Sequence, residues 1–320
     1  MSKWYIGIDL GGTFIKFGLL SDDLHARSIF QLPTPADGGA AIVEQMARGV
    51  GQLMGSDGID HGKIAGVGIG SPGPLNLSSG TIVDSPNIKG MQNFPLRDRV
   101  SAAVNLPAVL ENDANAAAYG EYLCGAGAGT RNMVMLTLGT GVGGGIIVEG
   151  QLVHGSRDAG GELGHTIIVP DGEPCGCGQR GCLERYCSAT YLAELTMRAI
   201  RQGQPSSLKA VMDARGAINT QDINEARKAG DALAARFWDD AARHLALACV
   251  NICRVFDPDE IVLSGGLSKA GEDLLGPVRK HFDAMNWTLM PNQTRIALAS
   301  LGNNAGVIGA AGVAWRASRQ

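Results

Sequence analysis

The chain has 320 residues, of which 45% are hydrophobic and 18% are charged, an ordinary balance for a globular protein of about two domains. Its formal net charge is −4, and Lys and Arg form no dense cluster, which argues against nucleic acid as a partner. No apolar run reaches the ~18 residues of a membrane span, and the first residues lack the charged and apolar regions of a signal peptide. We therefore expect a soluble, cytoplasmic protein with neither nucleic acid nor membrane as a partner.

The first third of the chain predicts strands that end in glycine turns, with helices between them. Residues 3–20 predict two strands around the turn 10–13, with Asp9 at the mouth of this hairpin. The elements that follow are predicted, in chain order, as a helix over 40–54, a strand over 64–70, a strand over 108–110 and a helix over 114–122.

The remainder of the chain continues this alternation. Its predicted elements are strands over 132–138 and 146–148 around a glycine-rich turn, helices over 189–202 and 231–256, a strand over 260–264 and a helix over 305–316. No element boundaries are predicted between residues 204 and 224. The face of the long helix is predicted to carry Leu233, Phe237, Ala241, Leu245, Ala248 and Ile252.

This order of elements indicates an α/β chain with mixed sheets. The likeness between the glycine turns at 9–13 and 139–145 suggests a duplicated architecture. We expect a small α/β domain over residues 1–120, joined by the C-terminal helix at about 304–320. A large α/β domain would take residues 121–303.

Three glycine turns are candidates for phosphate binding, because backbone N–H groups at such turns are fixed donors with no side chain in the way. The residues concerned are Asp9, Gly11, Gly12 and Thr13 in the first turn, Gly139, Thr140 and Gly141 in the second, and Gly265 and Gly266 in the third. The carboxylate of Asp9 can hold Mg²⁺ through water, and Thr13 and Lys16 are placed to meet phosphate. A single glycine hairpin often serves only to satisfy a positive φ, but three together favour phosphate binding.

The sequence Glu111-Asn112-Asp113 follows a predicted strand and precedes a predicted helix. An acid at this place can accept a proton from an alcohol, and the neighbouring amide of Asn112 can hold a second hydroxyl. Asn or Asp before a helix is also among the commonest helix caps, and position alone favours that interpretation. The phosphate turns favour Asp113 as a catalytic base, since phosphoryl transfer needs little more than a base and good alignment.

A cluster of His and Cys residues predicts a metal site in the loop 161–184. One imidazole and three thiolates, from His165, Cys175, Cys177 and Cys182, match a closed tetrahedral zinc site. The alternative is a set of free thiols, which would oxidise easily on an exposed loop. Because all four positions would be filled by protein, the predicted zinc is structural.

Taken together, these motifs resemble those of the ROK family of bacterial sugar kinases and repressors, and among them the ATP-dependent glucokinases most. The matching segments are Asp9–Thr13, Glu111–Asp113, Leu138–Gly145, Glu162–His165, Cys175–Glu184 and Ser264–Leu267. Residues 204–224 carry nothing specific to the family. The resemblance implies an actin-like ATPase (ribonuclease H-like) fold, in which two duplicated α/β domains hold sugar and nucleotide in the cleft between them.

The resemblance also implies a role for each matching residue. Asp113 would be the base, and the residues that hold sugar hydroxyls would be Asn87, Asn112, Asp113, Glu162, His165 and Glu184. The nucleotide would meet Gly11, Gly12, Thr13, Thr140 and Gly141, with Gly265 and Gly266 near the adenosine. The zinc-bound histidine can touch the sugar through its other ring nitrogen. Such kinases commonly form dimers, so we expect a homodimer or a dimer of dimers.

The expected function is the transfer of the γ-phosphate of ATP, as its Mg²⁺ complex, to the 6-hydroxyl of glucose, a step of glycolysis. Other hexose kinases, acting on N-acetylmannosamine, mannose or fructose, remain open, as does polyphosphate as the donor. A sugar-sensing repressor would need a DNA-binding segment before the first strand, where only Met1–Lys3 stand, so we do not expect that role. The intact Asp113 argues against a binding protein that has lost catalysis.

Overall fold

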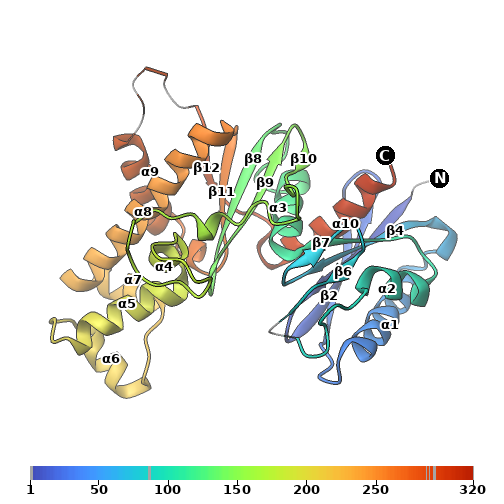
Figure 1. The fold of residues 1–320 in the computed structure, drawn as a ribbon, viewed down its shortest axis with the longest axis horizontal. Coiled ribbons are helices and arrows are strands. Elements are labelled where there is room, and N and C mark those ends of the chain that lie inside the picture. The colour runs from blue at the N-terminus through green and yellow to red at the C-terminus, as the bar shows by residue number, and fades with distance from the viewer. Residues whose placement is uncertain (1–2, 86–87, 286, 288, 291–292, 320) are drawn as a thin grey trace. The chain divides into compact units, whose positions relative to one another are not determined.

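The structure is a computed structural model that describes residues 3–85, 88–285, 287, 289–290 and 293–319 (Figure 1). The chain forms two compact units. Unit 1 consists of Met1–Thr130, Gly145–Gly161 and Ser300–Gln320, and unit 2 consists of Arg131–Gly144 and Glu162–Ala299. Residue 120, the expected boundary, lies inside a helix of unit 1, and the chain returns to this unit for 145–161 and again for its last residues.

The elements of unit 1 come from both ends of the sequence. They are β1 (Trp4–Leu10), β2 (Phe14–Ser21), β3 (Ala26–Pro33), α1 (Gly39–Asp57), β4 (Ile64–Ser71), β5 (Leu75–Asn76), β6 (Thr81–Ile82), α2 (Leu96–Val104), β7 (Ala108–Asn112), α3 (Asp113–Cys124), β10 (Gln151–Leu152) and α10 (Ala305–Ala317). Strand β9 (Val142–Val148) begins in unit 2 and ends in unit 1.

The sheet of unit 1 has the order β3-β2-β1-β4-β7. Strands β1, β4 and β7 run parallel, and β2 and β3 are added to β1 as an antiparallel meander. In this register Asp9 lies opposite Gly70, which in turn lies opposite Glu111. Because parallel strands end at the same edge of a sheet, Asp9 and the Glu111–Asp113 segment meet there, which is where ligands bind in open α/β sheets.

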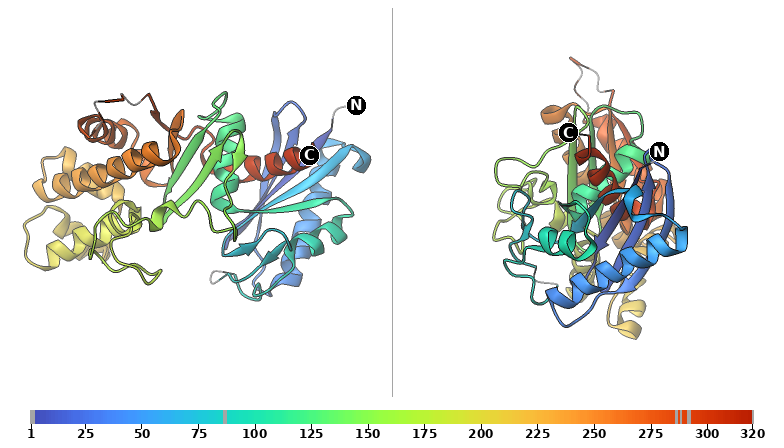
Figure 2. Two further views of the ribbon diagram at one scale, coloured as in Figure 1. Left: turned by 45° about the horizontal axis from the view of Figure 1, so that its top comes forward. Right: turned by 90° about the vertical axis from the view of Figure 1, so that its right-hand side faces the viewer.

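Alternation along β1 gives this sheet two buried faces. Ile6 and Ile8 pack with residues of α1 in one core, whereas Tyr5 packs with residues of α10 in another. Helices α1 and α2 therefore cover one face, and α10 and α3 lie on the opposite face (Figure 2). A period of two along the strand is what a sheet with helices on both sides requires.

Helix α10 packs against α3 at backbone distance. A Cβ added at Gly309 would lie 1.6 Å from the carbonyl oxygen of Ala116, so only glycine fits at this crossing. At the end of the same helix, the hydroxyls of Tyr5 and Ser318 are 3.0 Å apart. The C-terminal helix is thus part of the core that the N-terminal strand begins.

A second five-stranded sheet has the order β10-β9-β8-β11-β12. Strands β8, β11 and β12 belong to unit 2, β10 belongs to unit 1, and β9 begins in unit 2 and ends in unit 1. The remaining elements are β8 (Met133–Leu138), α4 (Glu184–Cys187), α5 (Ala189–Arg201), α6 (Leu208–Arg215), α7 (Thr220–Lys228), α8 (Ala232–Phe256), β11 (Glu260–Ser264), α9 (Glu272–Ala284) and β12 (Arg295–Leu298). The two sheets have the same strand order. In each, the first strand is central, the second and third strands lie on one side of it in sequence order, and the two later strands lie on its other side. This agreement supports the duplication that the two glycine turns suggested.

The long helix α8 differs from the prediction in one residue of its buried face. Trp238 is 2% exposed and donates from Nε1 to the carbonyl oxygen of Asp273 at 2.9 Å, whereas Phe237 is half-buried. The indole takes the buried position because its N–H finds an acceptor there. Phe237 instead lies beneath the guanidinium of Arg236.

Several elements were not predicted from the sequence. They are β3, β5, β6, β10, α2, α4, α6, α7, α9 and β12. The region 204–224 contains α6 and the start of α7, and α7 opens with a capping box between Asn219 and Asp222, a signal that the sequence does carry. Among the described residues, no helix combines the length and apolar character needed to cross a membrane.

Candidate functional site

Asp113 is the first residue of α3 and follows directly on β7. Asn112 is the N-cap, and its Oδ1 accepts hydrogen bonds from the amides of Ala114 at 2.9 Å and Asn115 at 3.2 Å. The capping function therefore belongs to Asn112, which keeps its amide N–H groups for another partner. A helix cap and a catalytic base are therefore compatible in this motif, because Oδ1 of Asn112 forms the cap and the carboxylate of Asp113 is the candidate base.

The side chain of Asp113 is half-buried. Burial raises the pKa of Asp113, while a hydrogen bond from the amide of Ala114 to its Oδ1, at 2.8 Å, acts in the opposite direction. Within the described part of the chain this is its hydrogen-bonding partner, and it involves one of the two oxygens. A carboxylate with a raised pKa and a free oxygen is suited to accept a proton.

Asp9 lies near Asp113 at the same edge of the unit 1 sheet. Burial raises the pKa of Asp9, Lys16 lowers it, and the charge of Asp113 raises it further. The Asp9 carboxylate also lies against the first turn of α10, where a Cβ on Gly306 would be 2.9 Å from its Oδ2. Lys16 donates from Nζ to the carbonyl oxygen of Asn303 at 2.6 Å, just before that turn.

The first glycine turn joins β1 to β2. The amide of Gly11 donates to the carbonyl oxygen of Phe14 at 3.0 Å, and the hydroxyl of Thr34 donates to the carbonyl oxygen of Gly11 at 2.7 Å. Gly12 and Thr13 are exposed. The structure thus brings Asp9, Lys16 and this turn together with Asn112 and Asp113 within unit 1.

The second and third glycine turns lie side by side in unit 2. The second is short, because Gly139–Gly141 forms the turn and β9 already begins at Val142. Gly265 follows β11 with a φ of 90°, and a Cβ added to it would be 2.5 Å from the carbonyl oxygen of Leu138. Only glycine allows this approach, so the two turns present their backbones together.

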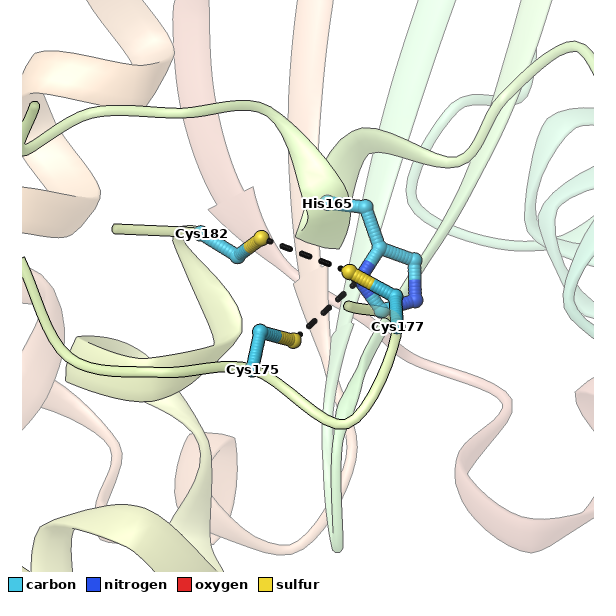
Figure 3. A group of neighbouring side chains, drawn as sticks. All are labelled: His165, Cys175, Cys177 and Cys182. Carbon is cyan, nitrogen blue, oxygen red and sulfur yellow. Dashed lines mark hydrogen bonds between the residues drawn. The ribbon is translucent and has the colours of Figure 1, made fainter. Parts of the chain in front are cut away.

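The four predicted metal ligands are close neighbours in unit 2. Figure 3 shows the side chains of His165, Cys175, Cys177 and Cys182 gathered at one point, and their ligand atoms all lie within 4.8 Å of one another. Isolated bridges between Ile167 and Cys182 and between Pro174 and Arg180 fold the loop back on itself.

The spacing of these atoms fits a zinc ion. Tetrahedral zinc with Zn–S bonds of about 2.3 Å requires sulfur atoms about 3.8 Å apart. The Sγ atoms of Cys177 and Cys182 are 3.7 Å apart, and the Sγ of Cys175 lies 3.7 Å from Nδ1 of His165. Nδ1 is therefore the ring nitrogen that faces the sulfurs, which leaves Nε2 of His165 for another contact.

Glu184 connects the metal loop to the second glycine turn. Its Oε2 accepts a hydrogen bond from the amide of Val142 at 3.1 Å, and the Sγ of Cys175 is 3.6 Å from its Oε1. Farther along, the amide of Ala189 donates to the carbonyl oxygen of Gly139 at 2.9 Å. The expected sugar ligand Glu184 thus also supports the expected phosphate turn.

The remaining expected site residues are Glu162, Asn87 and Gly266. Glu162 is exposed and directly precedes the short 3₁₀ helix Leu163–His165 in unit 2. Asn87 lies outside the described residues. In unit 2 a cavity of about 600 Å³ beside Gly266 is lined in part by Asn219, Gln221 and Lys269.

Two residues near Asp113 were not identified from the sequence. Glu111 is 2% exposed, and His154 donates from Nε2 to its Oε2 at 2.8 Å. The segment after β10 brings His154 against Glu111 on β7. The distance of 43 residues between the partners leaves no local signal in the sequence.

Comparisons with known proteins give consistent results. A family model described as the ROK family matches residues 5–317. A glucokinase of Halalkalibacterium halodurans is 38% identical over 309 residues, which cover 96% of this chain and 93% of that protein.

Two solved structures are similar over nearly their whole length. The ROK hexokinase of Thermus thermophilus has a TM-score of 0.84 and 34% identity, and the match covers 100% of this chain and 99% of that one. A ROK family glucokinase of Streptomyces griseus, in complex with glucose and AMPPNP, has a TM-score of 0.78 and 35% identity over 98% of this chain and 99% of that one. The expected actin-like ATPase fold is thereby confirmed.

Proposed function

Because this chain belongs to the ROK family, we propose that it is an ATP-dependent hexose kinase that phosphorylates the 6-hydroxyl of glucose. The observation that carries the proposal is the half-buried carboxylate of Asp113, held at the sheet edge beside Asp9 and the first glycine turn. The relatives named glucokinase support glucose as the substrate.

In this proposal Asp113 accepts the proton of the 6-hydroxyl as the sugar oxygen attacks the γ-phosphorus of ATP. The new P–O bond forms while the bond between the γ-phosphorus and the β–γ bridging oxygen breaks, and ADP leaves with that oxygen. The raised pKa of Asp113 makes it a better proton acceptor than an ordinary Asp once it is ionised. General bases of this kind contribute about 10²–10⁴-fold to the rate.

We assign the hold on the sugar hydroxyls to the residues that the family resemblance implies. Asn112 can use its amide N–H groups, since its Oδ1 is occupied by the helix cap. Glu162, Glu184 and Nε2 of His165 are the proposed partners in unit 2. Asn87 completes the proposed set.

The triphosphate is assigned to the glycine turns. Gly11, Gly12 and Thr13 offer backbone and hydroxyl donors, and Asp9 can hold the Mg²⁺ of the ATP complex through water. Thr140 and Gly141 offer the second set of donors. The adenosine is assigned to the side of Gly265 and Gly266, where the adjoining cavity offers polar side chains for a base and ribose.

We assign a structural zinc ion to His165, Cys175, Cys177 and Cys182, whose spacing fits tetrahedral coordination. With four protein ligands no coordination position is left for substrate, so the ion would stabilise the loop that carries His165 and Glu184. We further propose a cytoplasmic enzyme of glycolysis that acts as a homodimer or dimer of dimers.

A coupled assay on the purified protein tests the function. Glucose, mannose, fructose and N-acetylmannosamine are each offered with Mg²⁺-ATP and, separately, with polyphosphate, and the phosphorylated product is identified by position. The expected result is the highest kcat/KM for glucose with ATP. No phosphorylation of glucose by folded, zinc-loaded protein would rule out the proposal.

A further inference from the structure

A buried carboxylate precedes the proposed base by two residues. Oε1 of Glu111 accepts hydrogen bonds from the amide of Asn112 at 2.9 Å and from Nδ2 of Asn115 at 3.1 Å. Its Oε2 accepts from Nε2 of His154 at 2.8 Å. Glu111 is therefore hydrogen-bonded to residues on both sides of Asp113. His154 supplies the positive charge that offsets the burial of the Glu111 carboxylate.

His154 belongs to a segment, residues 153–161, that is itself well anchored. The amide of Gly160 donates to the carbonyl oxygen of His154 at 2.7 Å, which closes the segment into a loop. Asp158 accepts a hydrogen bond from the amide of Leu77 at 2.9 Å. The segment ends at Gly161, next to the proposed sugar ligand Glu162 in the sequence.

We propose that Glu111 and His154 are positioning residues for the kinase reaction. The protonated imidazole of His154 is needed to hold the segment Asn112–Asn115 where Asp113 can accept the proton. This inference rests on the proposed function of Asp113. Neither residue would touch the reacting atoms. Their effect would pass through the backbone at Asn112 and the first turn of α3, where a displacement of 1 Å can cost about 10²-fold in rate.

The charges around His154 determine the direction of its pH dependence. Glu111 on β7 raises the pKa of His154 through the hydrogen bond, and Asp158 on the same segment raises it further. Burial and Arg316 on α10 lower the pKa but do not outweigh the two carboxylates. The protonated form is thus retained to a higher pH than for an ordinary histidine, and it is lost as the pH rises through the raised pKa. We expect kcat to fall along that alkaline limb.

The test compares His154→Ala and His154→Gln with the wild type in steady-state kinetics over a pH series. Alanine leaves Glu111 buried without its partner, so kcat should fall about tenfold or more. The KM for glucose should rise by a smaller factor, because Asn112 is also a proposed sugar ligand. Glutamine places a neutral N–H donor where Nε2 stood but carries no charge, so it should recover only part of kcat and remove the alkaline limb. The control is His61→Ala, because the exposed His61 pairs with the carbonyl oxygen of Val104 in unit 1 and has no role in the proposed site.

Each outcome is decisive. A His154→Ala enzyme with lower thermal stability but unchanged kcat and pH profile would show a structural role and overturn the inference. If His154→Ala does not fold, an alkaline limb that persists in His154→Gln overturns it equally. A wild type that phosphorylates no hexose would instead contradict the proposed function, and this inference with it.

Discussion

At the scale of single residues, the Asn112-Asp113 pair shows how one turn can serve both structure and chemistry. Asn112 satisfies the free amides of α3, and Asp113 needs only one backbone donor to stay in place. Its remaining oxygen is available for a proton because its neighbour has taken over the cap. The cost is a carboxylate that burial makes harder to ionise.

Replacing Asp113 by Asn should separate catalysis from binding. The amide cannot accept the proton from the sugar, so we expect kcat to fall by about 10²–10⁴-fold. The shape of the side chain is retained, so the affinity for glucose should change little. Isothermal titration with glucose and a coupled assay measure the two quantities, and equal losses in both would point to a structural role.

The raised pKa of Asp113 also predicts how activity and stability depend on pH. The base must be ionised, so kcat/KM should fall as the pH decreases, at a pH above that expected for an ordinary Asp of pKa 3.8. For stability, the folded protein binds this proton more tightly than the unfolded chain does. The stabilising effect of protonation is therefore lost as the pH rises from 3.8 to the raised value, and ionisation opposes folding at neutral pH.

The Asp113→Asn protein should accordingly be as stable as the wild type or more stable at neutral pH. Thermal melts at neutral and acidic pH measure this, with the difference expected to shrink in acid. A clearly lower melting temperature for Asp113→Asn at neutral pH would contradict the prediction.

At the scale of elements, the metal loop and the second glycine turn act as one assembly. Glu184 contacts both the amide of Val142 and the Sγ of Cys175, and Ala189 holds Gly139. The loop has few apolar residues to bury, so the proposed ion would supply the stability that packing does not. Loss of the ion should therefore displace the second glycine turn as well as the proposed sugar ligands His165 and Glu184.

Replacing Cys175 by Ser should reduce zinc content, lower thermal stability and raise the KM for glucose. Because Glu184 also holds Val142, the affinity for an ATP analogue should weaken, which a titration without sugar can measure. Cys124→Ser is the matched control, since Cys124 lies in unit 1 and its Sγ donates to the carbonyl oxygen of Leu24, which a hydroxyl can also reach. Normal zinc content with unchanged nucleotide binding would contradict the proposed coupling.

At the scale of the whole chain, the two ends are folded into one core. Helix α10 follows about 300 residues after β1, yet it packs on that strand and on α3. Such a contact depends on small residues, because the helix backbones approach too closely for side chains between them. The C-terminal helix is therefore a structural requirement of unit 1.

Gly309→Ala should destabilise the protein by about 3 kcal/mol, because the new methyl would overlap the carbonyl oxygen of Ala116 and force α10 away. The matched control is Gly51→Ala on α1, where a Cβ meets nothing within 4 Å. That change should stabilise by about 0.5–1 kcal/mol through helix propensity. Urea unfolding measures both, and a Gly309→Ala midpoint equal to the wild type would refute the packing argument.

The sequence by itself determined the features that are local. Strands ending in glycine turns, the helix start at Asp113 and the spacing of the three cysteines are read over a few residues, and together they indicated the family and the actin-like fold. Many of the elements it missed are short, such as the four-residue strand β12. Helix α9 is an exception, because its 13 residues bury Leu274, Leu275, Val278 and Phe282 along one face, a helical pattern that the prediction overlooked.

Tertiary structure alone decided the contacts between distant segments. Trp238 rather than Phe237 is buried because the indole N–H donates to the carbonyl oxygen of Asp273. Glu111 can be buried because His154 donates a hydrogen bond to its carboxylate. Neither partner lies near in sequence, and the free energy of a buried polar group depends on the partner it finds. Residue periodicity carries no information about that partner, so only the folded chain could supply it.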